Sequence, residues 1–126
     1  TIASILVLEP EMILLDEPTA GQDLAHYTQI MDFLRELNKS GTTVVLITHD
    51  MHLMLEYTPR ALAFCDGRLI ADRSAAAILC DPALIGQAAL KETSLYTLAN
   101  RCGITPAEEF VERFIVADRE VRADGC

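Results

Sequence analysis

The sequence predicts an α/β fold built on a short parallel sheet. Two continuous runs of aliphatic and β-branched residues, 12–16 and 43–48, have the length of buried strands. An amphipathic segment separates them, and an Asp-Gly pair at 66–67 separates two further apolar runs. Strand, helix and strand in this order form one right-handed βαβ unit, so the first two strands are expected to run parallel.

The first strand is predicted at residues 12–16. It ends in the acidic pair Asp16 and Glu17, and Pro18 stops it because proline cannot donate a ladder hydrogen bond. An aliphatic run without polar alternation is typical of a strand that is buried on both faces. We therefore expect this strand to lie inside a layered sheet.

A helix of about four turns is predicted to begin at Leu24. Asp23 is a suitable N-cap, and Gly41 stands just past the end of the pattern. Apolar residues recur at intervals of three and four, which places them on one face of the helix: Tyr27, Ile30, Met31, Leu34 and Leu37. This face is expected to pack on the sheet.

An antiparallel hairpin is predicted beyond the second strand. Residues 61–65 and 68–71 flank Asp66 and Gly67, the dipeptide favoured in a two-residue type I′ turn. The hairpin is expected at the margin of the sheet.

The remaining chain is predicted to be helical. Short helices are expected at 74–79, 83–90 and 94–101, broken by Pro82, Thr93 and Gly103. Thr105, Pro106 and Glu108 form a capping box, with proline at the first position of a last helix. The charge-mixed segment after Ala117 is expected to fray.

Composition excludes several classes of protein. The chain has 126 residues, 51% of them hydrophobic, and a formal charge of −9 from nineteen acidic and ten basic side chains. This composition excludes a disordered or collagen-like chain. Nucleic-acid binding is not expected, because contacts to phosphate backbones come from clustered Lys and Arg.

The segment at the start of the sequence does not have the features of a membrane anchor. The apolar run from Ile2 to Leu8 is well short of the roughly 20 residues that span a bilayer. The chain does not begin with Met, so we expect it to be a piece of a longer protein. Its four cysteines have no C-x-x-C spacing and are interpreted as reduced thiols: Cys65, Cys80, Cys102 and Cys126.

Polar residues follow both parallel strands. Asp16 and Glu17 end the first strand and His49 follows the second, so all three are expected at one edge of the sheet, where open α/β folds place ligands. A carboxylate at a rigid strand end suits Mg²⁺, and its neighbour can accept a proton from water or orient it. Two acids at a strand end are also common in a solvated turn, so the pair alone leaves both interpretations open.

The surrounding residues resemble the ATP-binding subunits of ABC transporters. The string Ile13-Leu14-Leu15-Asp16-Glu17-Pro18-Thr19-Ala20-Gly21-Gln22-Asp23, followed by Ile47-Thr48-His49-Asp50, is similar to the Walker B strand, D-loop and H-loop of that family, in order and at suitable spacing. The resemblance implies a partial P-loop NTPase fold with ATP and Mg²⁺ as cofactors.

The resemblance also implies a role for each of five residues. Asp16 would organise Mg²⁺, and Glu17 would be the catalytic carboxylate. His49 would be the switch histidine that contacts the γ-phosphate. Gly21 and Asp23 would bind the cofactor from the D-loop, which crosses the interface with a second nucleotide-binding domain. Gln22 stands where leucine is common in the family.

The likeness is closest to the duplicated ATPases of energy-coupling-factor importers, which take up vitamins and metal ions. Residues 21–23, 48–54 and 91–95 carry this part of the likeness. It implies residues 1–73 as the C-terminal half of a nucleotide-binding domain, with 74–126 as a helical extension. An integral membrane subunit and a second nucleotide-binding domain would be the partners, and the cytoplasmic face of the membrane would be the location.

Two motifs of that family are absent from the 126 residues. Glycines stand at 21, 41, 67, 86, 103 and 125. No two are five apart or adjacent, so neither the phosphate loop G-x-x-x-x-G-K-[ST] nor the signature Leu-Ser-Gly-Gly-Gln can occur. Residues 1–7 would be the tail of the helix after that signature. The chain alone is therefore predicted not to hydrolyse ATP.

Three other interpretations remain. His49 and His52 have H-x-x-H spacing, but no further acid or cysteine completes a metal site in the sequence pattern. A second interpretation is a regulatory domain that keeps the ABC fold without catalysis. The presence of Asp16, Glu17 and His49 disfavours it, because such a domain has no chemical need for all three. An ABC-type ATPase of DNA maintenance would ordinarily carry basic surface or coiled-coil heptads nearby, and neither appears.

Overall fold

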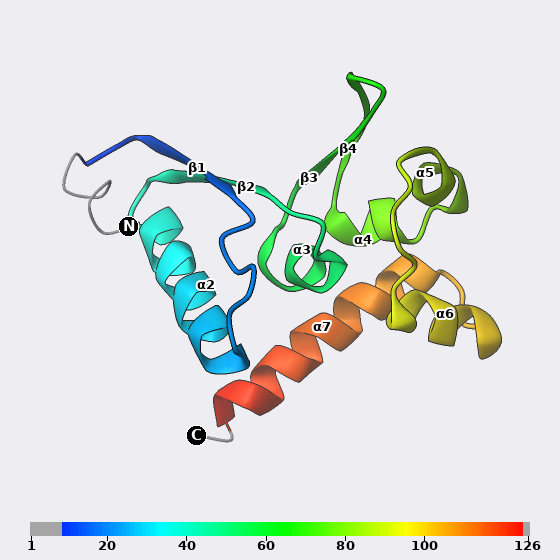
Figure 1. The fold of residues 1–126 in the computed structure, drawn as a ribbon. Coiled ribbons are helices and arrows are strands. Elements are labelled where there is room, and N and C mark those ends of the chain that lie inside the picture. The colour runs from blue at the N-terminus through cyan, green and yellow to red at the C-terminus, as the bar shows by residue number, and fades with distance from the viewer. Residues whose placement is uncertain (1–8, 125–126) are drawn as a thin grey trace. The chain divides into compact units, whose positions relative to one another are not determined.

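Figure 1 shows the fold in a computed structural model, which describes residues 9–124. The chain divides into two compact units, the first ending at His49 and the second beginning at Asp50. The functional division implied by the sequence, with a boundary after residue 73, is a different one and stays a prediction. The helix tail expected at 1–7 and the thiol of Cys126 lie outside the described residues.

The first unit contains the predicted βαβ arrangement. It consists of strand β1 (Met12–Asp16), helix α2 (Leu24–Lys39) and strand β2 (Thr43–Ile47). The strands pair in parallel, with Met12 opposite Thr43 and Asp16 opposite Ile47. The parallel pairing is thus confirmed, although β2 ends one residue before Thr48. Because the two strands end together, the residues that follow them share one edge of the sheet.

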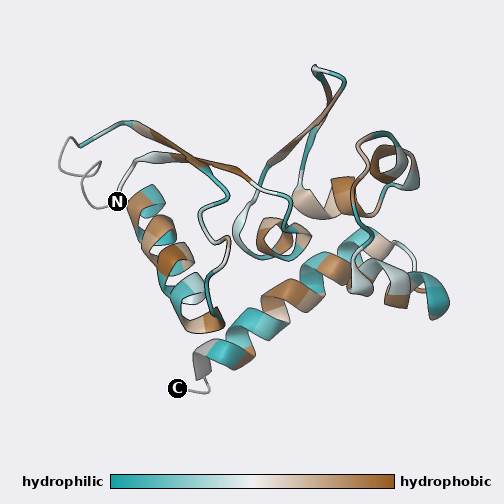
Figure 2. Ribbon diagram, viewed as in Figure 1, coloured by the Kyte–Doolittle hydropathy of each residue, from teal (hydrophilic) through white to brown (hydrophobic). Residues whose placement is uncertain are grey.

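Helix α2 covers one face of this sheet. Its N-cap is Asp23, as predicted, and the Asp23 carboxylate accepts a hydrogen bond from the His26 backbone N–H at 2.9 Å. The helix buries Met31 and Leu34, while Ile13 of β1 is buried in the sheet. Figure 2 shows the resulting division of α2 into an apolar and a polar side.

The other face of the β1–β2 sheet is exposed. The prediction that β1 is buried on both faces is therefore wrong for this chain. Met12 and Leu14 are 61% and 63% exposed, and Val45 and Ile47 of β2 are exposed beside them. Within the described part of the first unit α2 is the one helix, so it can cover only one of the two faces. An aliphatic run predicts a strand that is suited to burial on both faces. It does not predict whether the chain contains the helix or strand that would cover the second face.

In its described residues, 50–124, the second unit combines a hairpin with five helices. In chain order these are α3 (Met51–Tyr57), β3 (Ala61–Cys65), β4 (Arg68–Arg73), α4 (Ala75–Leu79), α5 (Pro82–Gln87), α6 (Ser94–Arg101) and α7 (Ala107–Asp124). No described helix is both long and apolar enough to cross a membrane. The core of this unit joins β3 and β4 to four of the helices through Leu55, Ala61, Ala63, Ala71, Ala75, Ala76, Ile78, Leu79, Leu84, Val111 and Ile115.

The β3–β4 hairpin has the predicted turn. The strands are antiparallel, and Cys65 pairs with Arg68 across the two-residue loop. Asp66 and Gly67 both have positive φ, +49° and +73°, which is the type I′ geometry expected of Asp-Gly.

Two of the three predicted short helices, α4 and α5, differ from the sequence prediction at their ends. α4 begins at Ala75 because Ser74 is its N-cap, and the Ser74 hydroxyl accepts from the Ala77 N–H at 3.1 Å. α5 begins at Pro82, one residue earlier than predicted, and ends at Gln87. α6 has the predicted bounds.

Helix α7 is longer than the sequence predicted. It begins at Ala107, so Pro106 precedes the helix instead of occupying its first position. The helix continues to Asp124, which shows that the prediction of fraying after Ala117 is wrong. Two ion pairs on the helix hold this last part: Arg122 contacts Asp118, one turn earlier, and also Glu56 of α3.

The contact between Arg122 and Glu56 ties α7 to α3. The Glu56 side chain is only 4% exposed, and its Oε1 lies 2.7 Å from Nη2 of Arg122. His52 Nε2 lies 3.3 Å from the other oxygen of the same carboxylate. A carboxylate this deeply buried needs such partners, since an unpaired buried charge is costly.

Replacing Arg122 by alanine is therefore expected to lower the free energy of unfolding of the chain by about 2 kcal/mol, because it leaves the buried Glu56 with one partner fewer. Urea denaturation of the purified chain measures this. Arg113→Ala is the matched control on the same helix, since Arg113 pairs with the half-exposed Glu109 and its loss is expected to cost less than about 1 kcal/mol. Equal losses of stability from the two substitutions would contradict a stabilising role for the contact between Arg122 and the buried Glu56.

Candidate functional site

Glu17 is fixed to the end of the neighbouring strand through its backbone. Its N–H donates to the Ile47 carbonyl at 2.8 Å, one step beyond the last pair of the β1–β2 ladder. Its φ is +44°, in the left-handed region that residues other than glycine seldom adopt. Such a conformation costs free energy and persists where the surrounding structure enforces it, often at functional sites.

The Glu17 carboxylate meets the two residues that follow β2. Its Oε1 accepts from the His49 backbone N–H at 2.8 Å and lies 2.6 Å from His49 Nδ1. Its Oε2 accepts from the Thr48 hydroxyl at 3.1 Å. The structure therefore brings together two residues that the sequence analysis placed at one sheet edge, Glu17 and His49.

The contact fixes the tautomer of His49. An ionised carboxylate only accepts hydrogen bonds, so Nδ1 must carry the proton that it donates to Glu17. Nε2 is then the nitrogen available to another molecule, as an acceptor in the neutral ring or a donor in the charged one. The His49 side chain is 89% exposed. Its outer nitrogen is thus accessible while its inner one is held.

These contacts also set the charge of Glu17. Partial burial raises the pKa of its carboxyl, but the hydrogen bonds from the His49 ring, the His49 backbone N–H and the Thr48 hydroxyl, with the charge of His49, outweigh burial and leave the pKa below its ordinary value. Glu17 is therefore ionised at neutral pH. An ionised carboxylate held at a strand end has the protonation state required of a base.

Asp16 lies next to this cluster, at the last position of β1. It is exposed, and by strand alternation it shares the open face of the sheet with Leu14. The contacts of Glu17 and His49 described above do not include Asp16, so the structure places Asp16 at the same edge without joining it to them.

The loop after Glu17 brings the chain to α2. Gly21 has φ +71°, which explains the glycine, because other residues are strained there. Asp23 ends the loop, and its carboxylate accepts from the backbone of His26 and lies 2.9 Å from the His26 ring. Asp23 thus has a structural role as N-cap. A contact of Gly21 or Asp23 with a cofactor stays a prediction.

The side chains at this edge can supply only part of the ligands of a Mg²⁺ ion. Asp16 offers hard carboxylate oxygens at an exposed strand end, the kind of ligand that Mg²⁺ prefers. Among residues 9–124 no group of three or more His, Cys, Asp or Glu side chains is arranged to hold a metal. A Mg²⁺ ion here would take its other ligands from water and phosphate oxygens, as it commonly does in nucleotide sites.

Thr48 belongs to this cluster, but the sequence analysis did not include it among the site residues. It was treated as the last residue of the second strand, and the structure ends that strand at Ile47. A hydroxyl residue directly after a parallel strand, opposite an acid that follows the neighbouring strand, is the signal that could have identified it.

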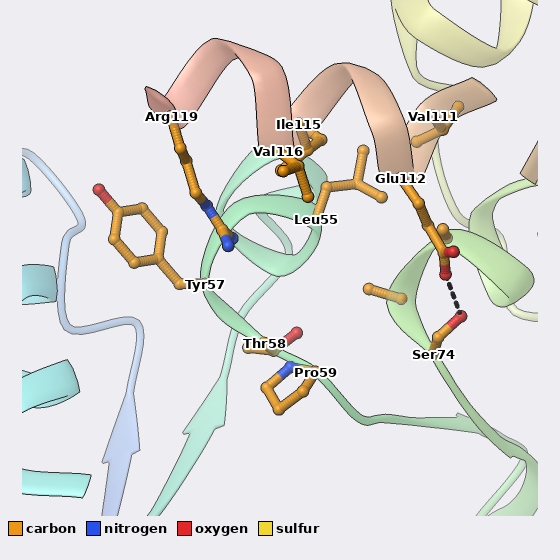
Figure 3. A pocket seen from close by; sticks show the side chains of 12 residues that line it. Leu55, Tyr57, Thr58, Pro59, Ser74, Val111, Glu112, Ile115, Val116 and Arg119 are labelled. Carbon is orange, nitrogen blue, oxygen red and sulfur yellow. Dashed lines mark hydrogen bonds between the residues drawn. The ribbon is translucent and has the colours of Figure 1, made fainter. Parts of the chain in front are cut away.

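A separate pocket lies within the second unit, between α3, α4 and α7 (Figure 3). It has a volume of about 320 Å³, and its lining includes Leu55, Val111 and Ile115. At one side the Ser74 hydroxyl lies 3.3 Å from Glu112 Oε1. None of the predicted site residues lines this pocket.

Comparison with known proteins gives close relatives. A protein of Enterococcus faecalis is 62% identical over 122 residues, which cover 97% of this chain and 22% of the relative. Relatives from Clostridium perfringens and Staphylococcus aureus are 58% and 50% identical, again over 97% of this chain. All three carry the provisional name ABC transporter ATP-binding protein. The chain spans about a fifth of the length of these relatives. No family model matches it.

Solved structures share the fold. The cbiO1 protein of Clostridium perfringens, described as part of the ABC transporter complex cbiONQ, is 31% identical, with a TM-score of 0.58 over 79% of this chain and 40% of that protein. An ATP-binding cassette of another ABC transporter is 29% identical, with a TM-score of 0.60 over 68% of this chain and 35% of that protein. The fold of the chain is thus that of a part of an ABC ATPase domain, and the chain belongs to the family of ABC transporter ATP-binding proteins.

Proposed function

We propose that the chain contributes the hydrolytic edge of an ATP-binding domain that powers an ABC-type membrane importer. The observation that carries this proposal is the contact of Glu17 with Thr48 and His49 across the ends of β1 and β2. It supplies an ionised carboxylate and an exposed imidazole nitrogen side by side, which is the pair needed to activate water next to a phosphate.

Each residue of the edge has a distinct role in this proposal. Glu17 accepts a proton from the attacking water or orients it. His49 presents Nε2 to the γ-phosphate while Glu17 holds Nδ1. Asp16 organises Mg²⁺, directly or through water, and that ion neutralises charge on the phosphate oxygens when it is bound.

The proposed partners follow from the family. A second nucleotide-binding domain would contact the loop of residues 20–23, which includes Gly21 and Asp23. An integral membrane subunit would bind on the cytoplasmic side of the membrane and respond to the conformational change that ATP hydrolysis drives. The cbiO1 protein is described as part of a complex, and this supports an energy-coupling-factor importer as the assembly. Uptake of a vitamin or a metal ion is the corresponding substrate class.

ATP hydrolysis by the full-length protein tests the proposal. We expect saturable turnover that depends on Mg²⁺ and is lost when EDTA removes the metal. Asp16→Asn is expected to lower kcat by about tenfold or more at a fixed Mg²⁺ concentration, because it removes the carboxylate charge that holds the ion.

Asp32→Asn is the matched control for this substitution. Asp32 is an exposed acid of α2, away from the strand ends, and pairs with Arg35 of the same helix. Its replacement is expected to leave turnover within about twofold. Turnover that is unaffected by EDTA, or equal loss from both substitutions, would contradict the assignment of Asp16.

A further inference from the structure

The two oxygens of the Glu17 carboxylate have different partners. Oε1 accepts from the backbone N–H of His49 at 2.8 Å and lies 2.6 Å from its ring. Oε2 accepts only from the Thr48 hydroxyl, at 3.1 Å, among the contacts that the described residues make with it. Thr48 therefore holds the oxygen that His49 leaves free.

This division determines where Glu17 can accept a proton. A carboxylate offers about four acceptor positions, two on each oxygen. The two contacts from His49 use both positions on Oε1, and the hydroxyl of Thr48 uses one on Oε2. The position that stays open lies on Oε2, so the orientation of this oxygen decides where a water molecule can be activated.

Thr48 is well placed to set that orientation. It directly follows Ile47, the last residue of β2 in the parallel ladder, and it is half-buried. The Glu17 backbone is anchored to the preceding residue, Ile47, at 2.8 Å. Donor and acceptor thus both lie next to Ile47, where the ladder ends, which lowers the entropy lost when the bond forms and limits rotation of the carboxylate.

We propose that Thr48 is a positioning residue for ATP hydrolysis: its hydroxyl aims Oε2 of Glu17 at the attacking water. This inference rests on the proposed function, because it assumes that Glu17 acts on that water. Thr48 itself touches neither substrate nor metal in this proposal. Its effect on turnover passes entirely through the Glu17 carboxylate.

The test compares two substitutions in the full-length protein. Thr48→Val keeps the shape of the side chain but removes the donor, and is expected to lower kcat for ATP by about tenfold while KM changes by less than about twofold. Thr48→Ser restores the hydroxyl and is expected to keep kcat within about threefold of the natural protein. If Thr48 had a purely structural role, Thr48→Val would not lower kcat while leaving KM nearly unchanged. Thr48→Ser would also not restore kcat.

Thr43→Val is the matched control, because Thr43 begins the same strand and is exposed at the opposite end of the sheet. It is expected to leave kcat unchanged. Thr48→Ala removes the same donor with a smaller side chain, so it provides the comparison if the valine protein fails to fold. Full turnover in either folded protein without the hydroxyl would overturn the inference.

Glu17→Gln in the same assay separates this inference from the proposed function. If Glu17→Gln abolishes turnover while Thr48→Val does not, only the role of Thr48 is refuted. If Glu17→Gln itself retains full turnover, the proposed function of Glu17 fails, and the inference fails with it.

Discussion

Glu17→Gln is expected to lower kcat for ATP hydrolysis by the full-length protein by about 10² to 10⁴, the usual contribution of a general base. Glutamine keeps the length and planarity of the side chain but cannot accept a proton from water. It also offers an NH₂ group in place of one carboxylate oxygen, so it cannot accept from Thr48 and His49 together. The dissociation constant for ATP is expected to change little, because Glu17 binds no phosphate in the proposed mechanism.

Two measurements separate these effects. Steady-state hydrolysis gives kcat, and equilibrium binding of ATP to the Glu17→Gln protein shows whether the nucleotide site is intact. Glu11→Gln is the matched control, since Glu11 is exposed just before β1, at the other end of the strand. Retention of more than about a tenth of the natural turnover by Glu17→Gln would refute the assignment of this residue as the base.

Most elements of both units were predictable because their signals are local. The bounds of β1 were predicted correctly, since an aliphatic run ends there at two acids and a proline. The cap of α2 by Asp23 and the turn at Asp66 and Gly67 depend on the chemistry of one or two residues. The parallel pairing of β1 with β2 followed from the single helix between them.

The features that sequence reasoning missed depend on tertiary contacts. Helix α7 continues past Ala117 because Arg122 meets Glu56, which lies far away in the sequence. The bond from Thr48 to Glu17 requires a register in which β1 and β2 begin and end together. It also requires a left-handed backbone conformation at Glu17. No residue pattern predicts a positive φ at a glutamate, because the conformation is unfavourable for that side chain in isolation.

The 126-residue chain by itself is expected to show no saturable ATP hydrolysis. Most contacts to a bound triphosphate come from the backbone N–H groups and lysine of a phosphate loop, and the glycine spacing shows that the chain contains no such loop. Asp16 and Glu17 are both acidic, so without that loop the edge repels a polyphosphate. The exposed Leu14 and Ile47 also favour association of the isolated chain.

The measurement is ATP turnover by the purified, monomeric chain, with the full-length protein assayed under the same conditions. The Glu17→Gln form of the chain is the necessary control, because a contaminating ATPase would be equally active in both preparations. Saturable turnover that disappears on this substitution would show that the chain binds and hydrolyses ATP without a phosphate loop. The proposed division of labour, in which this edge supplies the base and other polypeptide supplies the phosphate contacts, would then be wrong.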